Sequence, residues 1–217
     1  MKIGILGTGD VGRTLAGGFA ALGHEVVIGT REPGAEKVKA LLEQIGAGVR
    51  AASFAEAAQF GEVIVLAIGG VNVENAIRLA GAEHFAGKLV IDATNPLRFD
   101  APGQPPVLTV GHSDSGGEQT QRWLPAARVV KAFNIVGHPH MVAPDFNGDK
   151  PDMFICGNDA QAKQVVDGLI RALGWPASID LGDITKARYL EPLAMVWITH
   201  LFNNGFNPNH AFKLLHK

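Results

Sequence analysis

The first residues with a recognisable chemical pattern form a glycine-rich hexapeptide near the start of the chain. Gly7-Thr8-Gly9-Asp10-Val11-Gly12 has the spacing G-x-G-x-x-G, and it stands between an apolar run and a helical pattern. The three glycines permit a tight turn, close approach of the backbone to a pyrophosphate, and close packing of helix on strand. We therefore expect these six residues to bind the phosphates of a dinucleotide at a helix N-terminus. The alternative is a glycine-rich turn without a ligand.

The end of the expected second strand indicates which dinucleotide binds. Gly29-Thr30-Arg31 stands where an NAD-binding chain carries a carboxylate for the ribose 2′-hydroxyl. A carboxylate there would repel a 2′-phosphate. The Arg31 guanidinium binds such a phosphate with forked, charge-assisted hydrogen bonds, and the Thr30 hydroxyl donates another. The sequence therefore predicts NADP(H) as the cofactor rather than NAD(H).

Two charged residues beyond Arg31 leave alternatives open. Lys37 lies early in the next helical stretch, and it is either a second cation for the 2′-phosphate or an ordinary solvated helix charge. Glu32 is the counter-evidence, because it is compatible with a displaced carboxylate of the NAD type. The strand-end position of Arg31 favours NADP(H).

Short apolar runs alternate with helical patterns along the chain. The runs are mostly rich in Val, Ile and Leu without polar alternation, which is typical of strands covered on both faces. Expected strands span 2–6, 25–29, 49–52 (the weakest), 62–68, 89–93, 128–133, 153–156 and 177–181. Expected helices span 10–22, 35–45, 54–59, 73–79, 117–124 and 160–173. This order predicts an α/β fold: a Rossmann-like, doubly wound, mostly parallel sheet with helices on both faces and a C-terminal helical elaboration.

Three segments interrupt the alternation. Proline-rich loops over 94–115 and 137–151 follow strands, where open α/β sheets bind their ligands, and loops of this length are more often functional than idle. From 184 onwards, apolar residues recur with a helical period. We expect an NADP-binding domain over 1–181 and a helical segment over 182–217 within the same compact unit. So much apolar surface predicts burial of that helix on more than one side and contact with a second subunit in a homodimer.

The composition excludes several classes of protein. Of the 217 residues, 47% are hydrophobic and 18% are charged, which is the balance of a globular chain with a sizeable core. A formal net charge of −2 without a basic stripe argues against a nucleic acid or an anionic membrane surface as partner. No apolar run approaches the ~20 residues of a membrane span. The single Cys156 forbids an internal disulfide framework. We expect a cytoplasmic protein.

Three other residue types attract attention without predicting a site. His138-Pro139-His140 suggests a chelate, but no third ligand with a recognisable spacing accompanies it, so we expect hydrogen-bonded or solvated histidines and no metal. Cys156 ends an apolar strand, where a buried small hydrophobe is expected rather than a reactive thiol. Trp197 is expected in the core or in a subunit interface, and stacking on a planar cofactor is the alternative.

Taken together, these and further motifs resemble the family of NADP oxidoreductases dependent on coenzyme F420, a 5-deazaflavin. That family shares its nucleotide-binding architecture with the cytosolic domain of the six-transmembrane metalloreductases. Besides the two N-terminal motifs, the resemblance rests on Asp92-Ala93-Thr94-Asn95-Pro96, Val130-Lys131-Ala132-Phe133-Asn134, Cys156-Gly157-Asn158-Asp159 and Ala187-Arg188-Tyr189-Leu190-Glu191-Pro192-Leu193-Ala194. It covers nearly the whole chain. The chain departs from the archaeal deazaflavin enzymes in its shorter phosphate turn and in Asn134, where those enzymes carry a histidine near the strand end.

The resemblance implies roles for several residues. Thr30 and Arg31 would hold the 2′-phosphate, and Thr8 would lie in the phosphate turn. The strand ends would line the nicotinamide and a second, flavin-like ring of F420, FMN or FAD. These ends are Ala67-Ile68-Gly69, Thr94-Asn95-Pro96 and Phe133-Asn134-Ile135.

Hydride transfer between stacked rings requires proximity and alignment rather than a protein acid at the reacting carbons. We therefore expect no catalytic triad. Asn95 and Asn134, which end two strands, are the positioning candidates. The alternative for Asn95 is that the Asn-Pro pair simply starts a turn.

The sequence thus predicts an NADP(H)-dependent oxidoreductase that transfers hydride between NADPH and a small-molecule acceptor of the deazaflavin or flavin type. Two alternatives stay open. One is an NADPH-binding sensor without turnover, which would have no need of two long strand-end loops. The other is a reductase of small carbonyl or imine substrates, which calls for a Lys, His or Tyr acid. Lys131, inside an apolar strand, is a poor candidate for that acid.

Overall fold

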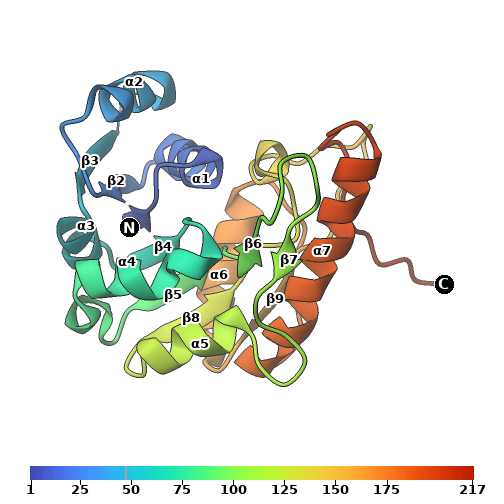
Figure 1. Ribbon diagram of the computed structural model, residues 1–217. Helices are drawn as coiled ribbons and strands as arrows, with labels where there is room; N and C mark the ends of the chain where they lie inside the picture. The colour runs from blue at the N-terminus through green and yellow to red at the C-terminus, as the bar shows by residue number, and fades with distance from the viewer. Residues whose placement is uncertain (47) are drawn as a thin grey trace.

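An eight-stranded sheet forms the centre of the computed structural model, which describes residues 1–46 and 48–217 (Figure 1). Its strands run in the order β10-β9-β8-β5-β4-β1-β2-β3. Their bounds are β1 Lys2–Leu6, β2 Glu25–Thr30, β3 Val49–Ser53, β4 Val63–Leu66, β5 Leu89–Asp92, β8 Arg128–Lys131, β9 Phe154–Gly157 and β10 Ile179–Asp180. The chain order reverses between β1 and β4, the switch point at which doubly wound sheets bind ligands.

The sheet is parallel except at one pairing. From β3 to β8 all neighbours are parallel, β9 pairs antiparallel with β8, and β10 is parallel to β9. The predicted Rossmann-like, mostly parallel sheet is therefore confirmed. Because the six strands from β3 to β8 all end at the same edge, the residues that follow them gather along that edge.

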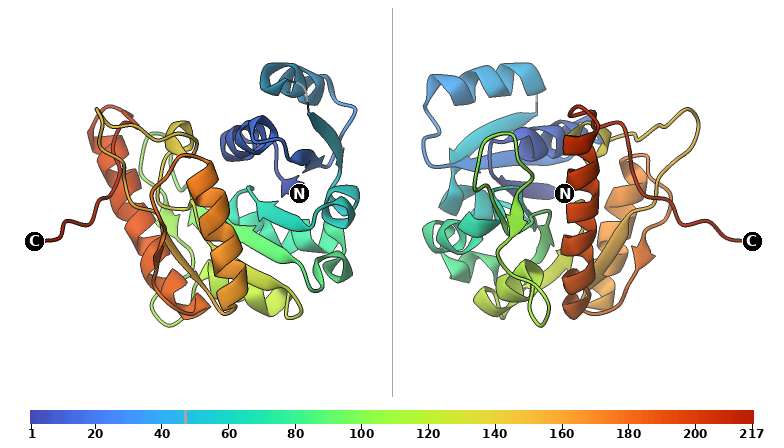
Figure 2. Two further views of the ribbon diagram at one scale, coloured as in Figure 1. Left: turned by 180° about the vertical axis from the view of Figure 1, so that it is seen from behind. Right: turned by 45° about the vertical axis from the view of Figure 1, so that its right-hand side comes forward.

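Helices cover both faces of the sheet (Figures 1 and 2). On one face lie α1 Asp10–Ala21, α2 Glu36–Ile45 and α6 Ala160–Ala172. On the other lie α3 Phe54–Phe60, α4 Val73–Ala80 and α5 Gly116–Trp123. The long α7, Ala187–Asn203, packs against α5 and β7. Short 3₁₀ helices span η1 Gly70–Asn72, η2 Ala82–Phe85, η3 His138–His140 and η4 Ile184–Lys186.

The central strands are apolar throughout because helices cover both of their sides. All four residues of β4 and all four of β5 are buried, including Asp92 at the end of β5. This two-sided burial explains why these runs lack polar alternation and why their strand character is visible in the sequence.

Several expected strands end earlier in the structure than the sequence predicts. The run over 62–68 gives only Val63–Leu66, and the run over 128–133 gives only Arg128–Lys131. Ala67 and Ile68 leave the sheet to line a cleft, and Phe133 has φ +64°, which no strand residue adopts. The apolar pattern continues past the strand end because these residues are buried or line the cleft.

Two further expectations need correction. The proline-rich loop over 94–115 contains a small hairpin of β6 Leu97–Arg98 and β7 Val107–Leu108, and strands this short leave no periodic signal. The segment over 182–217 is not helical to its end, because α7 stops at Asn203 and the next residues include Gly205, with φ +62°, and Pro208. Within this single chain, Tyr189 and Val196 of α7 are 68% and 58% exposed.

Candidate active site

The glycine-rich turn has the geometry of an anion site. Gly7 has φ +129°, and a Cβ there would lie 2.2 Å from the Ala67 carbonyl oxygen. A Cβ on Gly12 would lie 2.3 Å from the Gly7 carbonyl oxygen, so α1 packs directly on the turn. At Gly9, the N-cap of α1, a Cβ would have open space for 4 Å, and within the described chain no side chain caps the helix. The first amides of α1 therefore stay available to a ligand.

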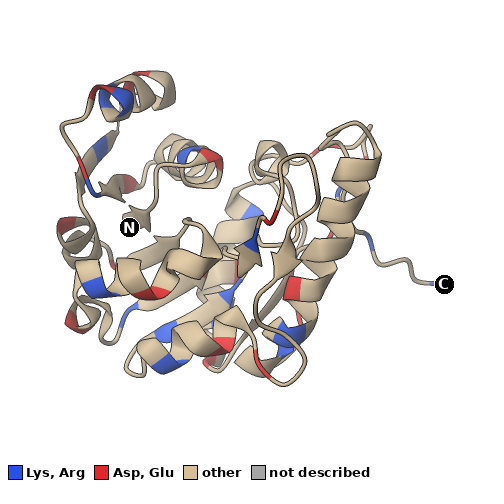
Figure 3. Ribbon diagram, in the orientation of Figure 1, with Lys and Arg blue, Asp and Glu red and all other residues tan. Residues whose placement is uncertain are grey.

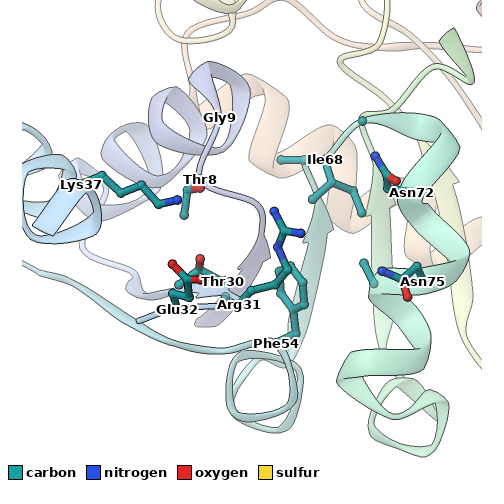
Figure 4. Close-up of a pocket in the computed structure, with 14 residues that line it drawn as sticks. Thr8, Gly9, Thr30, Arg31, Glu32, Lys37, Phe54, Ile68, Asn72 and Asn75 are labelled. Carbon is teal, nitrogen blue, oxygen red and sulfur yellow. The ribbon is translucent and has the colours of Figure 1, made fainter. Parts of the chain in front are cut away.

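A cleft of about 360 Å³ extends from this turn along the carboxyl edge of the sheet (Figure 4). Fourteen residues from β2, β4 and the helices around them form its walls. They are Thr8, Gly9, Gly29, Thr30, Arg31, Glu32, Lys37, Phe54, Ala67, Ile68, Gly69, Asn72, Asn75 and Ala76. This volume and position fit part of a dinucleotide at the switch point.

Two cations face the cleft from the β2 side. Arg31 projects from the end of β2 toward Phe54 and Ile68, and Lys37 extends from the first turn of α2 toward Thr8 (Figure 4). Among the residues that the structure describes, neither forms an ion pair with a carboxylate. Both charges are thus free to meet an anionic group. Their placement favours the cofactor interpretation of Lys37 over that of a solvated helix charge.

Glu32 lies in the same wall, so the structure does not remove it from the cleft. It stands two residues beyond the end of β2, whereas Thr30, which is 8% exposed, is the last residue of that strand. A phosphate in this corner has the two cations and the Thr30 hydroxyl as partners, and Glu32 as the one carboxylate in the cleft wall.

The opposite wall contains residues that sequence reasoning missed. Phe54 follows β3 directly. Because ligands bind beyond the carboxyl ends of the strands, this position could have been predicted from the sequence. Asn72 and Asn75 come from η1 and α4, with Ala76 beside them. The sequence does not indicate a role for Asn72 or Asn75, because polar residues are common on the exposed side of a short helix.

Several predicted cofactor residues do not line this cleft. Gly7 and Gly12 shape the turn, and Val11 belongs to the first turn of α1. Asp10, in the same turn, directs one carboxylate oxygen to Arg13 Nη2 at 2.9 Å. Asn95 and Pro96 lie beyond the far wall, where the backbone of Asn95 touches Gly70.

Asn95 and Asn134 form a reciprocal clasp between two strand ends. The side-chain amide of Asn95 donates to the carbonyl of Asn134 at 2.8 Å, and the amide of Asn134 donates to Asn95 Oδ1 at 2.9 Å. Asn134 also donates to the carbonyl of Leu190 in α7 at 3.1 Å. The left-handed backbone at Phe133 turns the chain so that Asn134 reaches these partners. The clasp joins the ends of β5 and β8 to α7, and the buried Asn134 Oδ1 has no partner within the described residues.

The remaining candidates do not converge on a centre. His138 Nδ1 lies 3.5 Å from Thr14 Oγ1, whereas His140 Nε2 lies 2.9 Å from Asn209 Oδ1. In the described part of the chain, no three His, Cys, Asp or Glu side chains are placed to hold a metal ion. Cys156 is fully buried, and burial raises the pKa of its thiol to about 12, as expected for a packing residue. Trp197 packs on His210, with ring centroids 4.5 Å apart.

Lysine 131 is held as a charged group deep in the fold. It is fully buried beside Asp92 and Glu191, and although burial alone would lower the pKa of Lys131, these two carboxylates raise it well above the ordinary value. Its ammonium is held by both carboxylates, and Lys131 is not among the residues that line the cleft. This observation weighs against a reductase that uses Lys131 as its acid.

Comparisons with known proteins fit this architecture. Residues 2–96 match the family model described as "NADP oxidoreductase coenzyme F420-dependent". The F420-dependent NADP reductase of Methanocaldococcus jannaschii is 32% identical over 206 residues, which cover 91% of each chain. A solved structure from Arthrobacter sp. FB24, assigned to the F420-dependent NADP-reductases, is 43% identical with a TM-score of 0.92 and full coverage of both chains.

A further relative is much longer than this chain. Metalloreductase STEAP3 of Rattus norvegicus is 30% identical over 194 residues, which are 89% of this chain but 36% of that protein. The chain therefore spans about a third of this relative. Among the residues described here, no helix has both the length and the apolar character needed to cross a membrane.

Proposed function

The chain belongs to the family of F420-dependent NADP reductases, and from that premise we propose that it transfers hydride between NADP(H) and a deazaflavin or flavin-type acceptor. The observation that carries the proposal is the cleft itself. Within the described residues, it joins an N-terminus of α1 that no side chain caps to two cations that no carboxylate pairs with, one at each end of the loop between β2 and α2. These are the two anion sites that NADP(H) requires, one for the pyrophosphate and one for the 2′-phosphate.

Each part of the cleft has a separate task in this proposal. The amides of the first turn of α1 bind the pyrophosphate, while Thr30, Arg31 and Lys37 bind the 2′-phosphate. The residues after β4 form the wall beside the nicotinamide, and the segment after β5 lies behind that wall, where the Asn95–Asn134 clasp joins it to α7. The bound cofactor supplies the hydride, so the protein acts by holding two rings in contact and aligned.

F420 is the first acceptor to test, because the relatives that match over nearly their whole length are F420-dependent NADP reductases. FMN and FAD carry a similar tricyclic ring and are the next candidates. A reductase of small carbonyls or imines is less well supported, since Lys131 is held in ion pairs and Lys37, in the cleft wall, is assigned to the 2′-phosphate.

A panel assay with the purified protein tests this proposal. Oxidation of NADPH is followed with F420, FMN, FAD, ferric chelates and small carbonyls as separate acceptors. Turnover with F420 or a flavin and none with carbonyls supports the proposal. Tight NADPH binding without turnover on any acceptor would instead favour the sensor alternative.

A homodimer through α7 is part of the proposal. Tyr189 and Val196, seven residues apart on the exposed side of the helix, are 68% and 58% exposed, and an apolar stripe on a helix is commonly buried by a partner. Sedimentation at micromolar concentration tests it, and a monomer would contradict it. The cytoplasmic location stays a prediction, and cell fractionation tests it.

A further inference from the structure

Three charged side chains are buried together where β5, β8 and α7 meet. The ammonium of Lys131 donates to Asp92 Oδ2 at 2.8 Å, to Glu191 Oε1 at 2.9 Å and to the carbonyl of Thr94 at 2.8 Å. The side chains of Lys131 and Asp92 are 0% exposed and that of Glu191 is 1% exposed. All three hydrogens of the ammonium are thus used inside the protein. We refer to Asp92, Lys131 and Glu191 as the charge cluster.

Both carboxylates of the cluster are surrounded by donors. Asp92 Oδ1 accepts from the backbone amide and the hydroxyl of Thr94 at 2.9 and 2.7 Å. The two oxygens of Glu191 accept from the amides of Gly117 and Gly116, each at 2.9 Å. Because every carboxylate oxygen accepts a hydrogen bond and none faces an acceptor, the arrangement is that of two ionised groups.

The cluster therefore carries two negative charges and one positive charge. The amides that bind Glu191 belong to the N-terminus of α5, which adds a partial positive charge of roughly half a unit. An excess of negative charge remains, and it is shielded from solvent. Figure 3 shows charged residues of both signs spread over the elements of the fold.

This negative charge lies directly behind the wall of the cleft. Gly69 lines the cleft, and a Cβ on its neighbour Gly70 would lie 2.0 Å from the carbonyl oxygen of Asn95. The preceding carbonyl, that of Thr94, accepts from Lys131. In the sheet, Asp92 is paired with Leu66, which immediately precedes the cleft residue Ala67. One strand spacing, ~4.8 Å, thus separates the strand that carries Asp92 from the strand that forms the wall.

We propose that the charge cluster favours the oxidised, cationic nicotinamide over the neutral dihydronicotinamide in the cleft, with Glu191 supplying the excess negative charge. Loss of a hydride, with its two electrons, from C4 leaves a pyridinium ring with one positive charge. A buried negative charge nearby stabilises that ring and the charge that develops as the hydride departs. The inference rests on the proposed function, because it requires NADP(H) in this cleft. Glu191 and Lys131 act here as positioning residues, without contact with the reacting atoms.

A purely structural role for the cluster makes a different prediction. If it served only to tie α5 and α7 to the sheet, its loss would loosen the wall and weaken the binding of NADP⁺ and NADPH alike. The ratio of the two dissociation constants therefore separates the two roles, and it is measured without acceptor and without turnover.

The decisive variant is Glu191→Gln in the full chain. Dissociation constants for NADPH and NADP⁺ are measured by fluorescence titration and by competitive displacement. The ratio Kd(NADP⁺)/Kd(NADPH) is expected to rise about 5- to 20-fold, because one unit of buried negative charge behind the wall is lost. The matched control is Glu118→Gln, which removes a carboxylate from the same α5–α7 contact. Glu118 is paired with the partly exposed Arg188 and is not part of the charge cluster, so its loss is expected to raise the ratio less than the loss of Glu191 does.

An unchanged ratio in folded Glu191→Gln protein would overturn the inference. If that variant does not fold, Asp92→Asn removes one negative charge on the other side of Lys131 and is expected to raise the ratio in the same way. Failure of the wild-type protein to bind either nucleotide would refute the proposed function instead, so the two failures are distinguishable.

Discussion

Along the carboxyl edge of the sheet, the polar groups around β1 and β2 are free, whereas those around β5 and β8 are bonded to one another. We call the first region the nucleotide half and the second the clasp half. Arg31, Lys37 and the first amides of α1 face an open cleft. Asn95, Asn134 and the charge cluster spend nearly all their hydrogen-bonding capacity inside the protein.

The difference separates recognition from support. A group that binds a ligand must be available, so it contributes little to the folded state before the ligand arrives. A buried group that holds the wall of the cleft in place must already have its hydrogen-bond or ion-pair partners, because an unpaired buried charge destabilises the folded state. Substitutions in the nucleotide half should therefore change affinity with little effect on stability. Substitutions in the clasp half should change stability most, and those that remove a carboxylate of the charge cluster should also shift the relative affinity for NADP⁺ and NADPH.

The largest expected effect is on stability and comes from Lys131→Met. Removing the ammonium leaves two buried carboxylates facing each other, and breaking a buried pair in this way costs about 3–5 kcal/mol. Urea unfolding measures the loss. The control is Lys163→Met, because Lys163 pairs with the half-exposed Asp180 near the sheet edge and should cost about 1 kcal/mol or less. Equal losses in the two variants would contradict the contrast between the halves.

The next effect is on cofactor choice. Arg31→Glu places a carboxylate beside the 2′-phosphate, so the dissociation constant for NADPH should rise by about 100-fold, as when a charged hydrogen bond of up to 3 kcal/mol is lost. The constant for NADH should stay the same or fall. The unfolding free energy should change by less than about 0.5 kcal/mol. An unchanged preference for NADPH over NADH would assign the 2′-phosphate to another group.

Gly9→Ala tests the phosphate turn without disturbing the fold. The Cβ meets nothing within 4 Å in the ligand-free cleft, but it occupies the space in which the pyrophosphate would approach the backbone. NADPH and NADH should both bind about 10- to 50-fold more weakly, because both share the pyrophosphate. Titration of each nucleotide measures this. Gly12→Ala is the contrasting variant, since its Cβ would collide with the backbone of Gly7 and should lower stability as well.

The smallest expected effect belongs to Lys37. Lys37→Ala should weaken NADPH about 3- to 10-fold and leave NADH unchanged, because a flexible ammonium at the mouth of the cleft is partly screened by solvent. Lys39→Ala is a matched control on the same helix, since Lys39 already pairs with Glu36. Comparable losses in both variants would show that general positive charge, and not a specific contact, attracts the nucleotide.

The sequence predicts where the residues of the nucleotide half lie in more detail than it does for the clasp half. The G-x-G-x-x-G spacing and the strand-end position of Arg31 are local patterns. Residues close together in the sequence are therefore enough to predict them. Asn95 and Asn134 stand out in the sequence as polar residues at strand ends. Nothing in the sequence indicates that their side chains bind each other. Lys131 was set aside as a poor acid, and its partnership with Asp92 and Glu191 spans 99 residues of chain, which no local pattern reports.

The same principle explains the errors at element ends. The apolar residues continue past the ends of β4 and β8 because the chain stays buried beyond the last hydrogen bonds of each strand. The end of α7 was missed because its apolar period runs into residues such as Phe206, which is exposed with φ +60°. The periodicity of apolar residues predicts which residues are buried. It predicts the backbone conformation of those residues less reliably.

The spacing of the charge cluster along the chain also affects the order of assembly during synthesis. A ribosome delivers β1, β2 and β4 within the first 66 residues, so the strands of the nucleotide half are complete early. Lys131 emerges next and finds Asp92, but the amides of Gly116 and Gly117 have to wait for Glu191, sixty residues later. Until Glu191 is synthesised, the nascent chain has the strands of the nucleotide half but lacks the contacts of Glu191 behind the wall of the cleft. Glu191 thus completes this wall late in synthesis, and a chain truncated before α7 would leave Lys131 without one of its two carboxylate partners.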